Sequence, residues 1–203
     1  MSNSEQEIEV KFPVRDLAAL SSRLEALGAR LVQERVHEIN LRFDTPTGEL
    51  TDRHQVLRLR QDFNAYLTFK GPAKPGEEVS SRQEIEFQVS DFEAARHFLE
   101  ALGYRVSVSY EKYRAVYSLG DVLCTLDELP FGKFVEIEGP DAGAIRTAAV
   151  ALKLDWEARS TASYLGLFNM LRSARGLSAK NLMFDEFQGI EVSVQDLGLR
   201  FAD

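Results

Sequence analysis

The residues of this sequence that are best suited to do chemistry are long acidic and basic side chains that alternate with apolar ones. Near the start of the chain, Glu7, Glu9 and Lys11 alternate with apolar neighbours, and five later segments repeat the pattern. Residues two apart on a β-strand point to the same face, so each segment is predicted to be a strand with one charged face. The charged positions are Glu7, Glu9, Lys11, Arg58, Arg60, Lys70, Arg82, Glu84, Glu86, Lys112, Arg114, Glu136 and Glu138.

This set combines six glutamates with seven lysines or arginines. Arg binds phosphate through two parallel hydrogen bonds, and Lys binds it as a compact point charge. Paired glutamates supply the hard oxygen ligands that suit Mg²⁺ or Mn²⁺, the ions that polyphosphates require. The residue types therefore indicate a site for a triphosphate-bearing small molecule, with Mg²⁺ or Mn²⁺ as the cofactor.

A charged strand face ordinarily faces water, but here the predicted helices also have apolar faces that must pack against something. If the apolar strand faces meet those helices, the charged faces must point the other way. In a closed antiparallel barrel that direction is the bore. The sequence therefore predicts an α+β fold, a closed β-barrel with a charged bore and with helices packed outside.

An internal repeat supports this arrangement. Residues 9–30 align with residues 84–105 at a constant offset of 75, and 11 of the 22 positions are identical. Each copy begins with an alternating strand and continues with leucines at helical spacing. Asp16 and Asp91 are predicted to cap the two helices at their N-termini, and Gly28 and Gly103 to end them. Two repeats suit a barrel built from two similar halves, whereas a solenoid needs at least three.

Further elements follow from the same patterns. Additional helices are predicted at Ala142–Leu154 and Ser163–Arg175. The remaining strands are predicted at Ile39–Asp44, Val56–Gln61, Ala65–Gly71, Lys112–Ser118, Val122–Glu128 and Phe134–Gly139. We expect residues 1–176 to form one domain and residues 177–203 to form a tail packed on that domain.

Composition narrows the class of protein. The 203 residues carry a net charge of −8, which argues against general nucleic-acid binding. No apolar run is long enough to span a membrane, the N-terminus does not resemble a signal peptide, and the single cysteine, Cys124, suits a reducing compartment. We therefore expect a cytoplasmic monomer or homodimer with Cys124 buried in the core. The three histidines show no metal-ligand spacing, and Trp156 is expected to pack rather than to stack on a substrate.

The ordered motifs resemble those of the CYTH, or triphosphate tunnel metalloenzyme, superfamily. The hallmark is Glu-x-Glu-x-Lys, present here at Glu7–Lys11, and the resemblance covers residues 5–172. The other matching segments are Phe43–Thr45, Leu57–Arg60, Leu67–Pro72, Arg82–Glu86, Glu111–Arg114, Asp127–Gly139 and Ser163–Leu165. Glu-x-Glu-x-Lys alone is a weak signal, but all of these motifs in order are specific.

The resemblance implies an eight-stranded antiparallel tunnel with assigned residue roles. Asp127 is implied as a metal ligand or a base, and it joins Glu9 and Lys11 as a candidate catalytic residue. Arg82, Glu84 and Glu86 match interior charges, and Arg82 is included among the candidate substrate contacts. The implied metal ligands are Glu7, Glu9, Glu136 and Glu138. The implied triphosphate contacts are Lys11, Arg58, Arg60, Lys70, Lys112 and Arg114.

Three activities are compatible with these motifs. Hydrolysis of a triphosphate needs only an anchored polyphosphate and an activated water. Class IV adenylyl cyclase activity, which converts ATP to cyclic AMP and pyrophosphate, also needs the ribose held beside the α-phosphorus, and the sequence shows no code for such contacts. The segment Phe43–Thr45 nevertheless resembles the cyclase and thiamine triphosphatase branches. A non-catalytic polyphosphate-binding module is the third alternative. We favour hydrolysis of inorganic tripolyphosphate, thiamine triphosphate or a nucleoside triphosphate.

Overall fold

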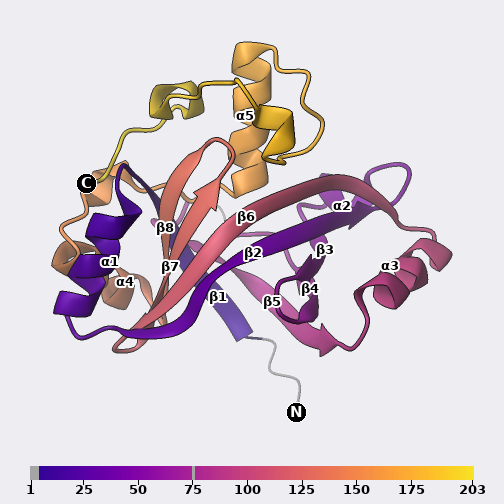
Figure 1. The fold of residues 1–203 in the computed structure, drawn as a ribbon. Helices are drawn as coiled ribbons and strands as arrows, with labels where there is room; N and C mark the ends of the chain where they lie inside the picture. The colour runs from indigo at the N-terminus through magenta and orange to yellow at the C-terminus, as the bar shows by residue number, and fades with distance from the viewer. Residues whose placement is uncertain (1–4, 75) are drawn as a thin grey trace.

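The chain forms a closed antiparallel β-barrel with helices packed outside it, which confirms the predicted α+β class. The computed structural model describes residues 5–74 and 76–203. The strands follow the order β1-β5-β4-β3-β2-β6-β7-β8 around the barrel (Figure 1). Their bounds are β1 Glu5–Val14, β2 Arg30–Asp44, β3 Val56–Gln61, β4 Ala65–Lys70, β5 Ser80–Val89, β6 Arg105–Leu119, β7 Val122–Leu129 and β8 Gly132–Glu138.

Helices connect these strands and cover the outside of the barrel. They are α1 Leu17–Ala26, α2 Glu49–Asp52, α3 Phe92–Ala101, α4 Ala142–Ala151 and α5 Tyr164–Arg175, with 3₁₀ turns η1 Trp156–Ala158, η2 Asp185–Phe187 and η3 Val194–Leu197. No helix in the described ranges is long and apolar enough to cross a membrane.

The repeated segments fold as predicted into β1–α1 and β5–α3. The Asp16 carboxylate accepts hydrogen bonds from the amides of Ala18 and Ala19, and the Asp91 carboxylate accepts one from Ala94. These bonds satisfy amides that have no partner within the first turn of a helix. Both helices end before a glycine with positive φ, +80° at Gly28 and +93° at Gly103, so the N-cap and C-terminal predictions are confirmed.

Strands β2 and β6 are longer than predicted. The sequence pattern placed them at residues 39–44 and 112–118, but they run from Arg30 to Asp44 and from Arg105 to Leu119 and pair along most of that length. Figure 1 shows them as two long neighbouring ribbons. Much of the added part of β2 is exposed on both faces, so it lacks the alternation that reveals a half-buried strand, and backbone pairing alone defines it.

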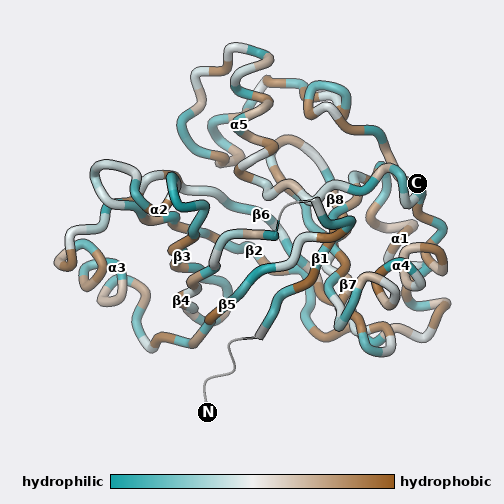
Figure 2. Tube along the Cα trace, turned by 180° about the vertical axis from the view of Figure 1, so that it is seen from behind, coloured by the Kyte–Doolittle hydropathy of each residue, from teal (hydrophilic) through white to brown (hydrophobic). Residues whose placement is uncertain are grey.

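Apolar strand faces pack outward against the helices, which leaves the polar faces for the bore. Seen from behind in Figure 2, the strands alternate hydrophilic and hydrophobic positions along their length. Helices α1 and α4 cover Val10 and Phe12 of β1 and Ile137 of β8, and α3 covers Leu59 of β3 through Leu99. The predicted orientation of the apolar faces is therefore observed.

Helix α5 and the segment that follows it form a third apolar cluster. Within this cluster Phe134 of β8 packs against Tyr164 of α5, with ring centroids 5.4 Å apart. The backbone of Leu182 pairs with β6 through hydrogen bonds of 3.0 Å to Ser109 and Glu111. At its other end, the Ala202 amide donates to the Pro13 carbonyl at 2.9 Å. Residues 177–203 therefore contact the barrel at two widely separated points.

Cys124 lies in the core beneath α4, as predicted. Its side chain is fully buried, and burial raises the pKa of the thiol to about 12. A thiol with that pKa is ionised to only about one part in ten thousand at pH 8. Since the thiolate is the reactive form, Cys124 is poorly suited to act as a nucleophile.

We expect Cys124 to resist a thiol-specific reagent in the native protein at pH 8 and to react at once in strong denaturant. The readout is the rate of chromophore release from a disulfide reagent, measured in both conditions. One equivalent of thiol per chain should appear after unfolding, because the chain has one cysteine. Rapid native-state labelling at unchanged circular dichroism would contradict the burial of this residue.

Candidate functional site

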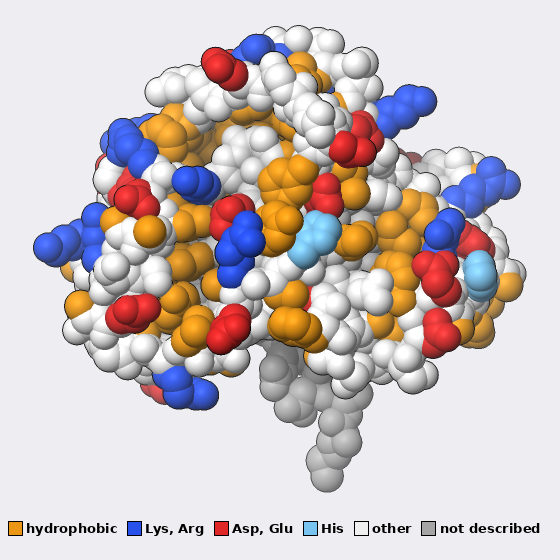
Figure 3. Space-filling model, in the orientation of Figure 1, with side chains coloured by type: hydrophobic (Ala, Val, Ile, Leu, Met, Phe, Trp, Pro, Cys, Tyr) orange, Lys and Arg blue, Asp and Glu red, His pale blue; other side chains and the backbone are white. Residues whose placement is uncertain are grey.

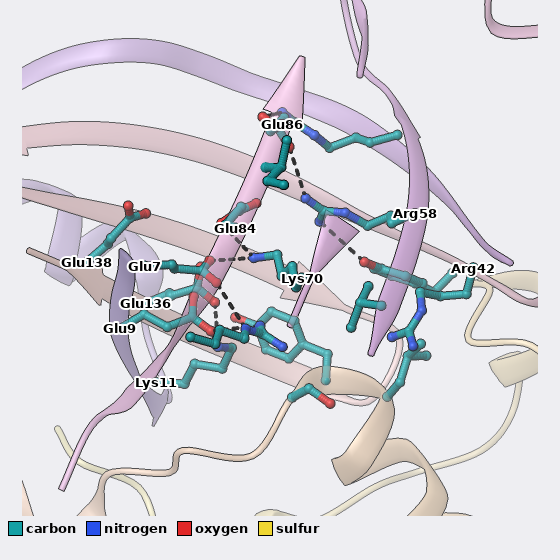
Figure 4. Close-up of a pocket in the computed structure, with 18 of the residues that line it drawn as sticks. Glu7, Glu9, Lys11, Arg42, Arg58, Lys70, Glu84, Glu86, Glu136 and Glu138 are labelled. Atoms are coloured by element: carbon teal, nitrogen blue, oxygen red, sulfur yellow. Dashed lines mark hydrogen bonds and ion pairs between the residues drawn. The ribbon is translucent and has the colours of Figure 1, made fainter. Parts of the chain in front are cut away.

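The bore of the barrel is a cavity of about 840 Å³ lined mainly by charged side chains (Figure 4). Every charged position found from the alternating pattern contributes to its wall, and one further base, Arg42, joins them. The charged lining residues are Glu7, Glu9, Lys11, Arg42, Arg58, Arg60, Lys70, Arg82, Glu84, Glu86, Lys112, Arg114, Glu136 and Glu138. On the outer face drawn in Figure 3, by contrast, acidic and basic side chains are scattered among neutral ones.

The strand order separates acids from bases inside the cavity. The six lining glutamates lie on three adjacent strands, β8, β1 and β5, which we call the acidic wall. Six of the eight lining bases lie on four other adjacent strands, β4, β3, β2 and β6. We call this side of the cavity the basic wall. The two exceptions, Lys11 and Arg82, lie among the glutamates. The tunnel therefore presents an acidic surface that faces a basic one.

Lys11 connects the two acidic strands β1 and β8. Its ammonium lies 2.6 Å from the Glu9 carboxylate and 2.9 Å from that of Glu136. Burial alone would raise the pKa of Glu136, but Lys11 and Arg114 hold it well below its usual range. Burial would likewise lower the pKa of Lys11, yet Glu136 and Glu9 raise it. Lys11 is therefore a permanent cation in this arrangement.

Other acids on the same wall are less well compensated. Burial raises the pKa of Glu138 to about 7, and the negative charges of Glu7, Glu136 and Glu9 add to the effect. Burial also raises the pKa of Glu84 to about 7, although Lys70 lies 3.1 Å from its carboxylate. The acidic wall therefore carries more negative charge than the neighbouring lysines and arginines neutralise.

Two bases hold Glu7 in place. Lys70 of β4 forms an ion pair with its carboxylate, and Arg82 of β5 donates to it at 3.1 Å. Burial would raise the pKa of Glu7, but Lys70 and Arg82 lower it to about 2. Glu7 is therefore ionised throughout the physiological range.

A buried carboxylate stands behind the basic wall. Glu38 of β2 is fully buried and lies 3.6 Å from both the Lys112 ammonium and the Arg60 guanidinium. Burial would raise its pKa, but Lys112, Arg114 and neighbouring arginines lower it to about 2. Inside the bore, Arg60 of the basic wall also lies 2.8 Å from Glu86 of the acidic wall. Glu38 thus balances part of the charge that the basic wall brings together.

Asp127, a predicted catalytic residue, does not line the cavity but lies behind it. It is fully buried, and Arg114 donates two hydrogen bonds to its carboxylate at 2.7 and 2.6 Å. The Tyr164 hydroxyl donates a third at 2.7 Å, and Lys112 lies 3.4 Å away. These contacts occupy both carboxylate oxygens, so Asp127 is placed to orient Arg114 and Lys112.

Some lining residues were not found from the sequence. The segment Glu38, Asn40 and Arg42 alternates with apolar residues in β2, and that alternation was the available signal for Arg42. Tyr110 and Tyr164 also line the cavity. Tyr164 belongs to a matched motif, but its position over Asp127 depends on how α5 packs, which no local pattern shows.

The four glutamates predicted as metal ligands share one wall of the cavity. Glu9 and Glu138 are register partners between β1 and β8, and Glu7 and Glu136 flank them. Their hard oxygens and surplus negative charge fit Mg²⁺ or Mn²⁺. Within the described chain, however, no three acidic, histidine or cysteine side chains converge as a ready-made metal cluster. Lys11 contacts one carboxylate oxygen each of Glu9 and Glu136.

Comparison with known proteins identifies the same family that the sequence motifs resemble. The family model of the CYTH domain matches residues 5–159. The adenylate cyclase CyaB of Aeromonas hydrophila is 30% identical over 185 residues, covering 87% of this chain and 90% of that protein.

Solved structures share the fold. A Vibrio parahaemolyticus protein assigned provisionally as an adenylate cyclase matches with a TM-score of 0.73 at 23% identity, covering 82% of this chain and 99% of that one. A Hippeastrum adenylyl cyclase candidate, described as having a dominant triphosphatase activity, matches with a TM-score of 0.59 at 22% identity, covering 80% and 95%.

We expect Asp127→Asn to lower the free energy of unfolding by about 3–5 kcal/mol, because it leaves Arg114 buried without its main counter-ion. Urea denaturation provides the measurement. The matched control is Glu128→Gln on the same strand, whose carboxylate also pairs with an arginine, Arg35, but at the surface. That change should cost less than about 1 kcal/mol. Equal losses in the two variants would refute the proposed dependence on burial.

The two glutamates of β8 should respond oppositely to neutralisation in buffer containing a chelator. Between about pH 4.5 and 7 the unfolded chain releases the Glu138 proton while the folded chain retains it, so folding stability falls as pH rises. Glu138→Gln removes this fall and should stabilise the protein above pH 7 by roughly 2–3 kcal/mol. Glu136→Gln should destabilise it there, because Lys11 and Arg114 lose a charged partner.

Denaturation curves from pH 5 to 9 measure both effects. If the difference in unfolding free energy between the wild type and Glu138→Gln stays constant from pH 5 to 9, the raised pKa of Glu138 is contradicted.

Proposed function

Since the chain belongs to the CYTH domain family, we propose that it is a divalent-metal-dependent triphosphatase that hydrolyses a triphosphate inside its tunnel. The observation that carries this proposal is the separation of charge in the cavity. A basic wall suits the phosphate oxygens, and the facing acidic wall suits the cations that accompany a polyphosphate. A charged bore with no ligand to serve would be costly to bury.

The basic wall would bind the substrate. Arg58, Arg60 and Arg114 present planar guanidinium groups that bind phosphate oxygens through paired hydrogen bonds, and Lys70 and Lys112 add point charges. Arg82 would reach the substrate from the acidic side. Lys11 stays protonated beside Glu9 and Glu136, so we assign it to neutralise the phosphoryl group under attack rather than to accept a proton.

The acidic wall would hold the metal. Glu7, Glu9, Glu136 and Glu138 are the proposed ligands, and a bound Mg²⁺ or Mn²⁺ would supply charge neutralisation and a more acidic water. We propose Asp127 as a positioning residue for Arg114 and Lys112, in place of the role of ligand or base, because its oxygens are already occupied.

In the proposed reaction a water oxygen forms a bond to the terminal phosphorus while the bridging P–O bond breaks. The diphosphate leaves with the electron pair of that bond. The proton lost by the water passes to a carboxylate of the acidic wall, for which Glu9 is the candidate. The products are one phosphate and one diphosphate for each triphosphate consumed.

Cyclisation of ATP is the second candidate, supported by the cyclase activity named for the Aeromonas hydrophila relative. In that reaction the ribose 3′-hydroxyl would attack the α-phosphorus and release pyrophosphate. We favour hydrolysis because it needs fewer positioned groups, and the fold neighbour from Hippeastrum is described with dominant triphosphatase activity. The complete set of glutamates in the cavity argues against a binding module that has lost catalysis.

The product assay separates these functions. With Mg²⁺ or Mn²⁺, purified protein should release phosphate from tripolyphosphate, thiamine triphosphate or ATP, with little cyclic AMP formed. Glu9→Gln should lower turnover by at least about tenfold because it removes a proposed ligand. Glu34→Gln, an exposed change on β2, is the matched control. Cyclic AMP and pyrophosphate formed in equal amounts, faster than phosphate from any substrate, would establish the cyclase alternative instead.

A further inference from the structure

Among the residues that the structure describes, Arg42 differs from every other base in the cavity because it forms no ion pair with an acidic side chain. Each of the other seven lining bases has at least one carboxylate oxygen within 4.0 Å, and their ion pairs involve Glu7, Glu9, Glu38, Asp62, Glu84, Glu86, Asp127 and Glu136. Within the ranges that the structure describes, no such ion pair involves Arg42. The protein therefore brings an uncompensated positive charge into a largely enclosed space.

The hydrogen bonds of the Arg42 guanidinium are also incomplete. Its Nε is buried without a hydrogen-bond partner, and one Nη donates to the Gln55 carbonyl over 3.5 Å, the upper limit for such a bond. The carboxylate of Asp44, two residues away, forms no direct ion pair with Arg42 and instead accepts hydrogen bonds from the backbone amides of Thr45, Leu50 and Thr51. Arg42 thus retains unused donors.

A second arginine lies directly beside it. Arg42 of β2 and Arg58 of β3 are register partners across the strand pair. Like charges opposite each other on a sheet destabilise it unless something neutralises them. Burial lowers the pKa of the Arg42 guanidinium, and the positive charges of Arg58 and Arg82 lower it further, although Tyr110 and Asp44 act in the opposite direction. The pair suits an anion placed between the two side chains.

The position of this pair in the tunnel indicates which part of a substrate it would meet. In the closed ring β2 is separated from β1 by three strands in either direction, so it lies opposite the acidic wall. Figure 4 shows Arg42 and Arg58 on the side of the cavity away from Glu7, Glu9, Glu136 and Glu138. The Tyr110 hydroxyl, 3.5 Å from Arg58, borders the same region.

We propose that Arg42 and Arg58 form an anion subsite for the non-reacting end of the substrate, so that the tunnel selects a linear inorganic polyphosphate, anionic at both ends. The proposal rests on the proposed function for the other end, which is attacked at the acidic wall. Arg58 already has Glu86 as an ion-pair partner, but an uncharged nucleoside or similar group at this position would leave the Arg42 guanidinium without a carboxylate partner among the described residues. A terminal phosphoryl group supplies oxygens for the unused donors of Arg42 and separates the two like charges.

The test compares the binding of tripolyphosphate with that of ATP to wild type, Arg42→Gln and Arg42→Lys, using calorimetry in a chelator so that no turnover occurs. Arg42→Gln should weaken tripolyphosphate binding by about 10- to 100-fold, as expected for the loss of charged hydrogen bonds. Its effect on ATP should stay below about threefold. Arg42→Lys should recover part of the tripolyphosphate affinity because the charge is kept but the paired hydrogen bonds are lost.

Arg30→Gln, at an exposed position of the same strand, is the matched control and should bind as wild type does. Thermal unfolding checks that each variant is folded, and Arg42→Lys serves as the test if Arg42→Gln is not. The subsite is refuted if Arg42→Gln leaves tripolyphosphate binding unchanged, or if it weakens ATP to the same extent. If tripolyphosphate affinity falls selectively but no triphosphate is hydrolysed when metal is restored, the subsite stands and the proposed triphosphatase function fails.

Discussion

The structure depends on ion pairing between the acidic and basic side chains that are buried in the bore of the barrel. Six glutamates and eight bases of the described chain line the cavity, and each would be costly to bury alone. Lys11 bridges two carboxylates, Lys70 and Arg82 secure Glu7, and Asp127 fixes Arg114 from behind. The compensation is nevertheless incomplete in two places, the acidic wall around Glu138 and the arginine pair at Arg42. These are the places where a cation and an anion would be most strongly attracted.

The rigid surroundings allow such an arrangement to persist. The apolar strand faces are held by α1 and α4 on one side and α3 on another, while α5 and the C-terminal segment pack on a third cluster. Because each strand alternates, any residue packed outward fixes the direction of its charged neighbours. The core thus determines the geometry of the site: a register slip of one residue in β1 would move Glu7, Glu9 and Lys11 to the outer surface.

Alternation in the sequence was enough to predict the barrel and nearly all charges of its bore, because a strand's pleat assigns each side chain to a face. Alternation could not predict whether an inward-facing side chain reaches the cavity or is covered by other residues. Asp127 shares the inward face with Arg114, its register partner, yet lies beneath the wall because Tyr164 of α5 covers it. The extent of β2 was also missed, because most of its added part is exposed and shows no alternation. The added part of β6 does alternate, from Val106 to Tyr110, and that signal was available but not used. The inward position of Arg42 was detectable from the alternation in β2. Its lack of an ion pair, which sets it apart from the other lining bases, can be seen only in the three-dimensional structure.

The internal repeat has a geometric consequence for these charges. Shifting every strand label by four, so that β1 becomes β5 and β5 becomes β1, maps the ring onto itself in reverse order, which is the signature of a twofold axis. At the offset of 75 residues Glu7 corresponds to Arg82, and the two are register partners between β1 and β5. The axis therefore passes between them. Two identical separate subunits would be forced to place the same residue at both positions, whereas a single chain can place an acid beside a base, so breaking the symmetry is what makes an electrically polarised bore attainable.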